Sequence, residues 1–229
     1  MLPTAPVVFL LDVDNTLLDN DQVTRDLKQH LVHTFGPDRE QRFWSIFEDC
    51  RKERGYADYL GALQRYRVEH PHDPSILQMS LFLVDYPFRT RIFPGALDVI
   101  RWLRDWGPAV ILSDGDAVFQ PLKVQRSGIM DAVDNNVLIY IHKEEQLADV
   151  ERHYPAKQYV LIDDKLRILT AVKKIWGTRV TTVFPRQGHY AHDEQIVESN
   201  PPADITIDQI ADLQRYDLPT LLAASGGPA

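Results

Sequence analysis

Short apolar runs along the chain alternate with segments whose apolar residues recur at helical spacing. The first run, Val7–Leu11, is followed directly by the polar stretch Asp12–Thr16, a pattern typical of a buried parallel strand that opens into a loop. Further strands are predicted at Ala109–Leu112, Val137–Ile141, Tyr159–Ile162, Arg179–Val183 and Asp204–Ile205, and helices at Ala96–Trp106, Phe119–Ser127, Lys143–His153, Lys165–Trp176 and Ile207–Leu213. Alternating strands and helices predict an α/β fold, with a Rossmann-like parallel sheet covered by helices on both faces.

The segment between the first strand and Pro94 has a different pattern. From about Asp21 to Val84 the apolar residues keep helical spacing, as at Phe43, Ile46 and Phe47, which predicts several helices and no strand. Pro71 and Pro74 separate two of these helices. We therefore expect residues 1–17 and 91–229 to form the α/β core and residues 18–90 an inserted all-helical cap. The tail Ser225–Ala229 is predicted to be disordered.

Composition and charge narrow the classes of function. Hydrophobic residues make up 44% of the 229 residues, and 33 acidic residues outnumber 25 basic ones, for a formal charge of -8. This balance argues against a nucleic-acid-binding surface, and Val7–Leu11 is too short to span a membrane. Cys50 is the only cysteine, which excludes an internal disulfide and a cysteine-based zinc site. We expect a cytoplasmic enzyme, a monomer or homodimer, with no nucleic-acid or membrane partner.

Four polar clusters follow predicted strands, and ligands bind at the carboxyl ends of such strands. These clusters are Asp12–Thr16, Ser113–Asp116, His142-Lys143 and Asp163-Asp164. Carboxylates gathered on one rim repel each other unless a cation lies among them, and oxygen ligands in an open site suit Mg²⁺. A lysine, a serine hydroxyl and the backbone of Gly115 can bind phosphoryl oxygens. A carboxylate can act as a nucleophile toward phosphorus.

These clusters carry a resemblance to the haloacid dehalogenase-like superfamily. Asp12–Thr16 is similar to its first motif, Asp-x-Asp-x-Thr, and Ser113 at a strand end matches the second. Lys143, 20 residues before Asp163, matches the third motif, and Asp163-Asp164 matches the double-acid form of the fourth. The resemblance spans roughly residues 7 to 183. The helical insertion resembles the cap that follows motif one in many phosphatase-type members.

The resemblance implies a role for each motif residue. Asp12 would be the nucleophile that forms an aspartyl-phosphate, and Asp14 would protonate the leaving oxygen and then deprotonate the hydrolytic water. Ser113 and Lys143 would hold the phosphoryl group of a small phosphorylated metabolite. Asp163 and Asp164 would bind Mg²⁺ together with the Asp12 side chain and the Asp14 carbonyl. Asp114 and Gly115 complete the candidate phosphate-binding set, although Asp114 and Asp116 fit turn and capping positions better.

Asp14 favours phosphoryl transfer over dehalogenation, because halide leaves without a proton whereas an alkoxide benefits from an acid. Hydrolysis of a phosphomonoester is the leading hypothesis. A phosphosugar mutase would share every motif. A phosphate-accepting signalling module, similar to response-regulator receivers, would place the acidic pair early and the acceptor aspartate in mid-chain, the reverse of this order.

Several assignments stay open at this point. Lys123 is a rival to Lys143 for the third motif, and Thr16 alone could cap the next helix. Asn15 occupies a position that is often glycine in the family, and asparagine tolerates the left-handed backbone region. Substrate contacts from Arg186 or His189, or from cap residues, are undecided; the cap candidates are Arg51, Arg54, Tyr56 and Arg65. Cap hinges are expected near Leu17–Asn20 and Pro87–Pro94.

Overall fold

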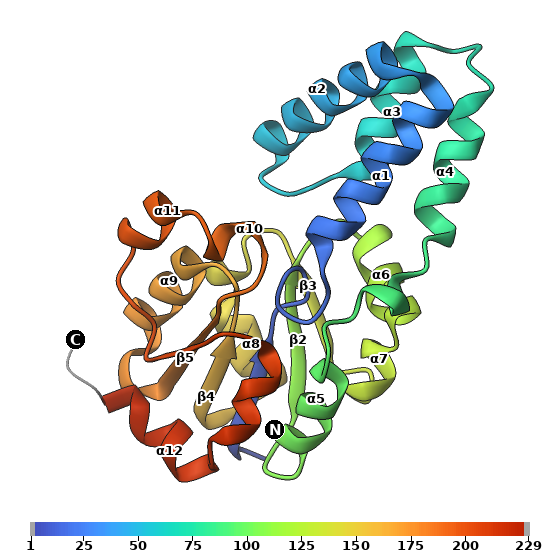
Figure 1. The fold of residues 1–229 in the computed structure, drawn as a ribbon. Coiled ribbons are helices and arrows are strands. Elements are labelled where there is room, and N and C mark those ends of the chain that lie inside the picture. Colours follow the sequence, from blue (N-terminus) through green and yellow to red (C-terminus); the bar gives the residue numbers. More distant parts are fainter. Residues whose placement is uncertain (1–2, 227–229) are drawn as a thin grey trace.

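The computed structural model describes residues 3–226 and contains one sheet of six parallel strands (Figure 1). The strands are β1 (Ala5–Leu11), β2 (Ala109–Asp114), β3 (Val137–Tyr140), β4 (Ala156–Ile162), β5 (Val180–Pro185) and β6 (Ile205–Ile207), in the spatial order β3-β2-β1-β4-β5-β6. In the register Leu11 pairs with Ile111 on one side and Ile162 on the other. The carboxyl ends of the three central strands therefore lie at one level.

Alternate residues of β1 belong to two different hydrophobic clusters, as the two faces of a strand require. Phe9 and Leu11 pack with α5 (Ala96–Arg104), whereas Val8 and Leu10 pack with α8 (Leu147–His153) and α9 (Leu166–Trp176). The other core helices are α6 (Phe119–Ser127), α7 (Ile129–Ala132), α10 (Gly188–Ala191), α11 (Glu194–Glu198) and α12 (Leu218–Ala223). The predicted α/β class, with helices on both faces of a parallel sheet, is confirmed.

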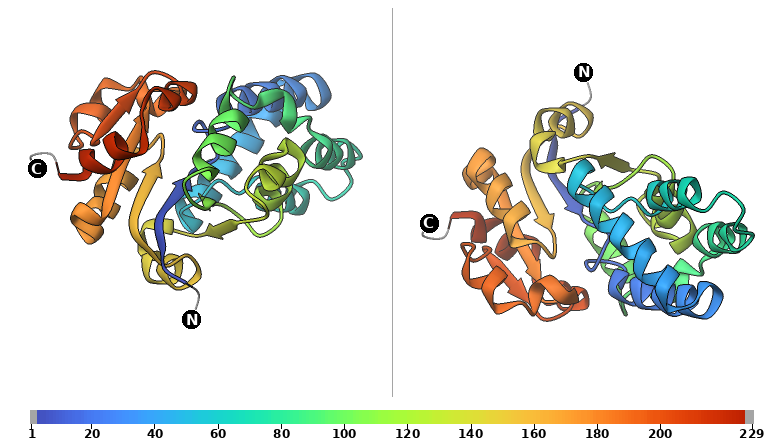
Figure 2. Two further views of the ribbon diagram at one scale, coloured as in Figure 1. Left: turned by 90° about the horizontal axis from the view of Figure 1, so that it is seen from below. Right: turned by 90° about the horizontal axis from the view of Figure 1, so that it is seen from above.

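Four helices follow β1, and the described part of the insertion contains no strand other than isolated bridges. They are α1 (Asn20–Phe35), α2 (Pro37–Arg54), α3 (Tyr59–Glu69) and α4 (Ser75–Asp85). Seen from above, these helices lie over the half of the sheet that holds β2 and β3 (Figure 2). Tyr59 contacts Phe119 at 5.4 Å between ring centroids, and Phe119 contacts Phe88 at 5.6 Å. Aromatic packing thus joins the four helices to the α/β part.

Two linkers connect these four helices to the sheet, and they are paired with each other. Leu18 and Ile92 form an antiparallel bridge. The Asp19 N–H donates to the Arg91 carbonyl oxygen at 2.8 Å, and the Phe93 N–H donates to that of Leu17 at 2.9 Å. The α1 helix begins directly after Asp19, whose carboxylate accepts from the Gln22 N–H at 2.8 Å. Asp19 is therefore the N-cap, and Thr16 is not.

Most differences from the predicted elements are at their ends. The predicted helix Lys143–His153 is divided, because Lys143–Glu145 form a 3₁₀ turn and α8 begins only at Leu147. Helices α7, α10, α11 and α12 were not predicted. The predicted helix Ile207–Leu213 is wrong, because Ile207 ends β6 and a 3₁₀ turn follows at Ile210–Arg215. Ala224–Gly226 form a further 3₁₀ turn, so the prediction of disorder is wrong for Ser225 and Gly226. The rest of that tail lies outside the described residues.

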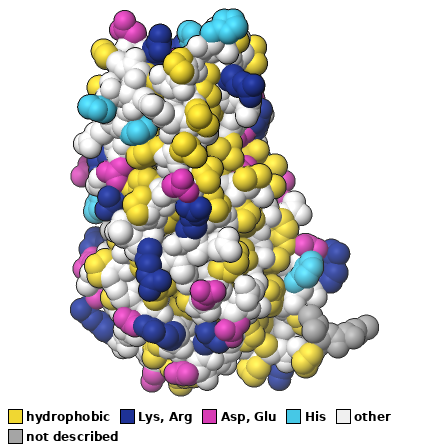
Figure 3. All heavy atoms as spheres, turned by 90° about the vertical axis from the view of Figure 1, so that its right-hand side faces the viewer, with side chains coloured by type: hydrophobic (Ala, Val, Ile, Leu, Met, Phe, Trp, Pro, Cys, Tyr) yellow, Lys and Arg dark blue, Asp and Glu magenta, His cyan; other side chains and the backbone are white. Residues whose placement is uncertain are grey.

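One side of the molecule combines hydrophobic side chains with scattered charges (Figure 3). Helix α4 buries Met79 and Leu83 but leaves Leu77 and Leu81 more than half exposed. Within residues 3–226 no helix has the length and apolar character needed to cross a membrane. The oligomeric state, monomer or homodimer, stays a prediction.

Candidate active site

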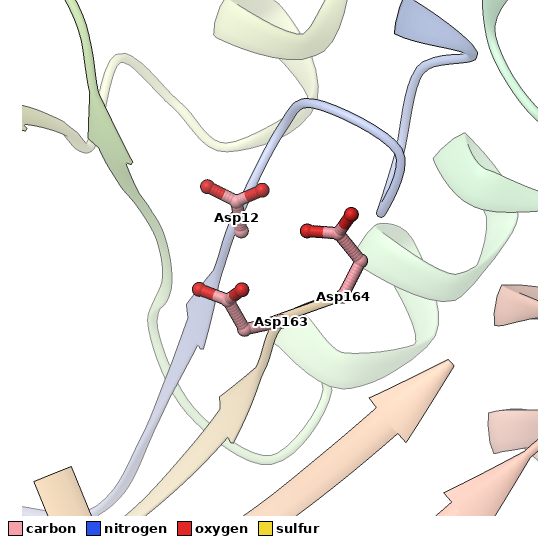
Figure 4. Close-up of side chains that lie close together, drawn as sticks. All are labelled: Asp12, Asp163 and Asp164. Carbon is pink, nitrogen blue, oxygen red and sulfur yellow. The ribbon is translucent and has the colours of Figure 1, made fainter. Parts of the chain in front are cut away.

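Three buried carboxylates converge where β1 and β4 end. Asp12 follows β1, Asp163 and Asp164 follow β4, and each offers one oxygen within 4.8 Å of the others (Figure 4). Their residues are at most 3% exposed. The parallel register places Asp12 beside Asp163, because the preceding residues Leu11 and Ile162 are paired. The position of this cluster follows directly from the alignment of the two strands.

Lys143 provides the buried counter-charge of this cluster. Its Nζ lies 2.5 Å from Asp12 Oδ1 and 2.6 Å from Asp163 Oδ2, and it donates to the Leu112 carbonyl oxygen at 3.0 Å. The preceding residue, His142, has a positive φ of 58°. Burial alone would lower the pKa of Lys143, but the Asp12 and Asp163 carboxylates outweigh it and hold that pKa above its usual value. Lys143 is therefore a protonated partner of two acids.

The acidic pair is less well compensated. Burial raises the pKa of Asp163 to about 6, against the opposing effect of Lys143. Burial also raises the pKa of Asp164 well above its usual range, and the neighbouring Asp163 and Asp12 charges add to this. Within the described residues, neither carboxylate oxygen of Asp164 has a hydrogen-bond partner, and Asp12 Oδ2 has none. Such buried oxygens are costly unless a cation or donor reaches them.

Asp14 lies apart from the three buried carboxylates. Its Oδ1 accepts from Lys123 Nζ at 2.6 Å, and its Oδ2 accepts from Gln120 Nε2 at 3.4 Å. Lys123 is almost completely buried on α6 and also donates to Asn20 Oδ1 at 3.1 Å. The two rival lysines therefore have different partners. Lys143 contacts Asp12, and Lys123 contacts Asp14.

The residues after β2 are arranged by short hydrogen bonds. Ser113 Oγ accepts from Gln120 Nε2 at 2.9 Å, which leaves the hydroxyl hydrogen free to donate. Asp114 Oδ1 accepts from the Lys143 N–H at 2.7 Å. The Gly115 N–H donates to the Tyr140 carbonyl oxygen at 3.0 Å, so in this conformation it is not available to a phosphoryl oxygen. A Cβ on Gly115 would come within 2.6 Å of Gln120, which explains why the position is glycine.

Asn15 and Thr16 attach the first loop to the loops that follow β4 and β5. Asn15 has a φ of 59°, in the left-handed region that asparagine tolerates. Thr16 Oγ1 accepts from the Asp164 N–H at 3.0 Å. Gly188 packs so closely that a Cβ there would lie 2.5 Å from Asn15. The loop after β5 therefore fixes the position of the first motif.

A cavity of about 1030 Å³ lies between the inserted helices α1, α2 and α3 and the carboxyl edge of the sheet. Asp14, Asp114 and Asp164 line it, whereas Asp12 and Lys143 are nearly completely buried. Arg51 and Tyr56 line it from the inserted helices. Arg54 and Arg65, which the sequence left as candidates for substrate contacts, are instead hydrogen-bonded to Asp58 and Glu53. Arg186 bonds to Asp208, while His189 lines the cavity and donates its N–H to Asp21.

Lys165 is a cavity residue that the sequence indicated only as the start of a helix. It directly follows the acidic pair and lines the cavity. Its Nζ lies over the ring of Tyr190, 5.5 Å from the centroid. Burial alone would lower the pKa of Lys165, but the charges of Asp164, Asp12 and Asp163 raise it. Its position directly after the acidic pair is the feature of the sequence that could have indicated Lys165 as a site residue.

Lys143→Met should strongly destabilise the metal-free protein. The change leaves the buried carboxylates of Asp12 and Asp163 without their cation, and removing one partner of a buried ion pair costs about 3–5 kcal/mol. Urea unfolding in EDTA measures the change. Lys174→Met, which removes an exposed charge from α9, is the control and should change stability by less than about 0.5 kcal/mol. Equal stabilities of the two variants would contradict the role of Lys143 as a counter-ion.

Comparisons with known proteins agree with this arrangement. No protein-family model and no curated protein matches the chain. Among solved structures, a protein described as a haloacid dehalogenase-like hydrolase from Burkholderia xenovorans is 59% identical, with 93% of this chain and 99% of that chain covered and a TM-score of 0.89.

More distant structures share the fold. A HAD-type hydrolase from Bacillus subtilis, bound to magnesium, has a TM-score of 0.62 at 14% identity, covering 93% of this chain and 98% of that one. An L-2-haloacid dehalogenase from Xanthobacter autotrophicus, with chloropropionic acid covalently bound, has a TM-score of 0.59 at 16% identity and the same coverages. With 59% identity to the Burkholderia protein over nearly its whole length, the chain belongs to the haloacid dehalogenase-like hydrolases.

Proposed function

We propose that this hydrolase cleaves a small phosphomonoester with the help of Mg²⁺, through an aspartyl-phosphate on Asp12. The proposal rests on three buried carboxylates, Asp12, Asp163 and Asp164, of whose six oxygens four have no hydrogen-bond partner among the described residues. A cation among them would remove the cost of burying these charges. The adjacent Asp14, which faces the cavity, provides a second acid for proton transfer.

The donor set fits Mg²⁺ in its chemistry. Hard carboxylate oxygens suit this ion, and the site contains no competing thiolate. Asp12, Asp163 and Asp164 would hold it with the Asp14 carbonyl oxygen. When bound, Mg²⁺ supplies positive charge that offsets the charge of the phosphoryl oxygens.

The reaction proceeds in two displacements. An Asp12 carboxylate oxygen bonds to phosphorus while the bond from phosphorus to the ester oxygen breaks, and Asp14 gives its proton to that leaving oxygen. A water molecule then attacks the same phosphorus and loses a proton to Asp14. The bond from phosphorus to the Asp12 oxygen breaks, which releases orthophosphate and restores both carboxyl groups.

Other residues orient these groups. Lys143 fixes the Asp12 carboxylate through Oδ1 at 2.5 Å, and Lys123 fixes Asp14 at 2.6 Å. The Ser113 hydroxyl, held by Gln120, can donate to a phosphoryl oxygen. Preorganised donors and charges of this kind act without reorganisation during the reaction.

The wild-type protein should release phosphate from p-nitrophenyl phosphate in the presence of Mg²⁺, and EDTA should abolish the release. Asp12→Asn removes the nucleophile and should abolish it as well. Phosphate and p-nitrophenol assays measure both products. Release of chloride from 2-chloropropionate, with no phosphate release from any ester, would show that the proposal is wrong.

Asp164→Asn should stabilise the metal-free protein by about 1–3 kcal/mol at neutral pH, because it removes a buried charge with no partner. The pKa of Asp164 is raised on folding, so the ionised group opposes folding above that pKa. The stability gained by Asp164→Asn should therefore shrink as the pH falls through the folded-state pKa of Asp164. Thermal unfolding in EDTA and in Mg²⁺ tests this, since only the wild type should gain strongly from Mg²⁺. Equal Mg²⁺ stabilisation of both proteins would exclude Asp164 as a ligand.

Asp14→Asn should give a burst of p-nitrophenol equal to the enzyme concentration, followed by turnover slowed by about 10²–10⁴-fold. The p-nitrophenolate ion leaves without a proton, so the first displacement survives, but the second has lost its base. Stopped-flow absorbance measures the burst, and acid quenching followed by mass spectrometry detects the phosphorylated chain. Asp12→Asn is the control and should give no burst. A slow phase without a burst would contradict the second role of Asp14.

A further inference from the structure

We propose that Arg51 selects phosphomonoesters whose leaving group carries a carboxylate. The proposal rests on the proposed function and adds a substrate class to the same site. Arg51 lies in the last turn of α2 and lines the cavity from the side of the inserted helices. The buried carboxylates that would serve the phosphoryl group lie at the carboxyl edge of the sheet. Arg51 therefore borders the part of the cavity that is left for the leaving group.

The end of α2 packs against the loop that carries Lys143. Gly55 follows the helix with a φ of 81°, and its N–H donates to the Arg51 carbonyl oxygen at 2.9 Å. A Cβ on Gly55 would come within 2.6 Å of the ring of His142, the residue directly before Lys143. This close packing fixes the position of the turn that carries Arg51 relative to the site.

Arg51 and Asp14 both lie close enough to the Tyr59 hydroxyl to act on its charge. Tyr59 is buried at the start of α3 and lines the cavity. Burial raises the pKa of Tyr59 to about 12, the Asp14 carboxylate adds to this rise, and the Arg51 guanidinium opposes it. The acid that would serve the leaving oxygen and the guanidinium of Arg51 therefore border the same part of the cavity.

The Arg51 side chain is available to a ligand. Among the described residues its ion-pair partner is Glu48, at 3.4 Å, and both side chains are about half exposed. An exposed pair of this kind contributes little to stability. Arg54, in contrast, is paired with the buried carboxylate of Asp58. Arg51 can therefore exchange Glu48 for a carboxylate of the substrate at small cost.

The inserted helices bring a small excess of positive charge to the cavity, although the whole chain has a formal charge of -8. Helices α1 and α2 line the cavity with three cations, on Arg25, Lys28 and Arg51, and with two carboxylates, on Asp21 and Glu48. One positive charge in excess matches a carboxylate better than it matches a second phosphate dianion. The planar guanidinium also fits a carboxylate through two parallel hydrogen bonds.

Two pairs of esters test the proposal, because the members of each pair differ only in a carboxylate that replaces a hydroxymethyl group. The pairs are 3-phosphoglycerate with glycerol 3-phosphate, and 6-phosphogluconate with sorbitol 6-phosphate. In at least one pair, kcat/KM of the wild type for phosphate release should be about tenfold higher for the carboxylate ester, the ratio expected for one charge-assisted hydrogen bond. Arg51→Gln should remove most of this preference, and Arg51→Lys should recover part of it. Lys52→Gln removes an equal charge from an exposed position of α2 and should keep the preference.

Gly55→Ala tests whether packing on His142 holds Arg51 in place. The added methyl group would meet the His142 ring, so the preference should fall. His142→Asn in the same chain should restore part of it, because asparagine is smaller and tolerates the φ of 58° at this position. Gly36→Ala is the matched control, since Gly36 ends α1 with a φ of 82° but a Cβ there meets no atom within 4 Å. Equal effects of Gly55→Ala and Gly36→Ala would overturn this role of His142.

A wild type that prefers neither carboxylate ester would overturn the proposal. Equal losses for both members of a pair in Arg51→Gln, in a variant whose thermal unfolding shows it to be folded, would overturn it as well. Failure of the proposed function has a different signature, which is no phosphate release from any ester, or release that survives Asp12→Asn. Calorimetric titration of the four esters would then still decide the role of Arg51. Tighter binding of a carboxylate ester that is lost in Arg51→Gln supports the proposal, and equal binding by both proteins overturns it.

Discussion

The burial of several like charges at one edge of the sheet is the constraint on which this site depends. Five carboxylates, on Asp12, Asp14, Asp114, Asp163 and Asp164, gather there with three ammonium groups, on Lys123, Lys143 and Lys165. When all are ionised, the site has two more negative than positive charges, which is the charge of one divalent cation. The parallel topology makes the arrangement possible, because it brings residues far apart in sequence to the same strand ends.

Much of this arrangement could be predicted from the sequence, because strand ends are marked by abrupt changes from apolar to polar residues. The α/β class followed from these changes. Side-chain partners could not be predicted in the same way, because they depend on how loops from distant strands pack. Lys123 and Lys143 both have the right chemistry, and only the fold places one on Asp14 and the other on Asp12. Gly115 was expected to offer its N–H, but β3 occupies it.

Family membership and chemistry rest on different observations here. The 59% identity to the Burkholderia protein establishes the family, whereas the distant dehalogenases share only a fold, and one fold supports many reactions. The residues that contact Asp14 lie outside the common sheet. Lys123 and Gln120, which hold Asp14, come from α6, and the cavity wall above them comes from the inserted helices.

The paired linkers restrict how those inserted helices can move. Two independent linkers would permit rotation about many axes, but the bridge between Leu18 and Ile92 joins them into a short two-stranded ribbon. Such a ribbon bends readily across its plane and resists shear within it, since shear would break the backbone hydrogen bonds at 2.8 and 2.9 Å. Bending across the ribbon is therefore the displacement of the inserted helices that keeps both hydrogen bonds. Such a bend would change the width of the cavity between these helices and the carboxyl edge of the sheet.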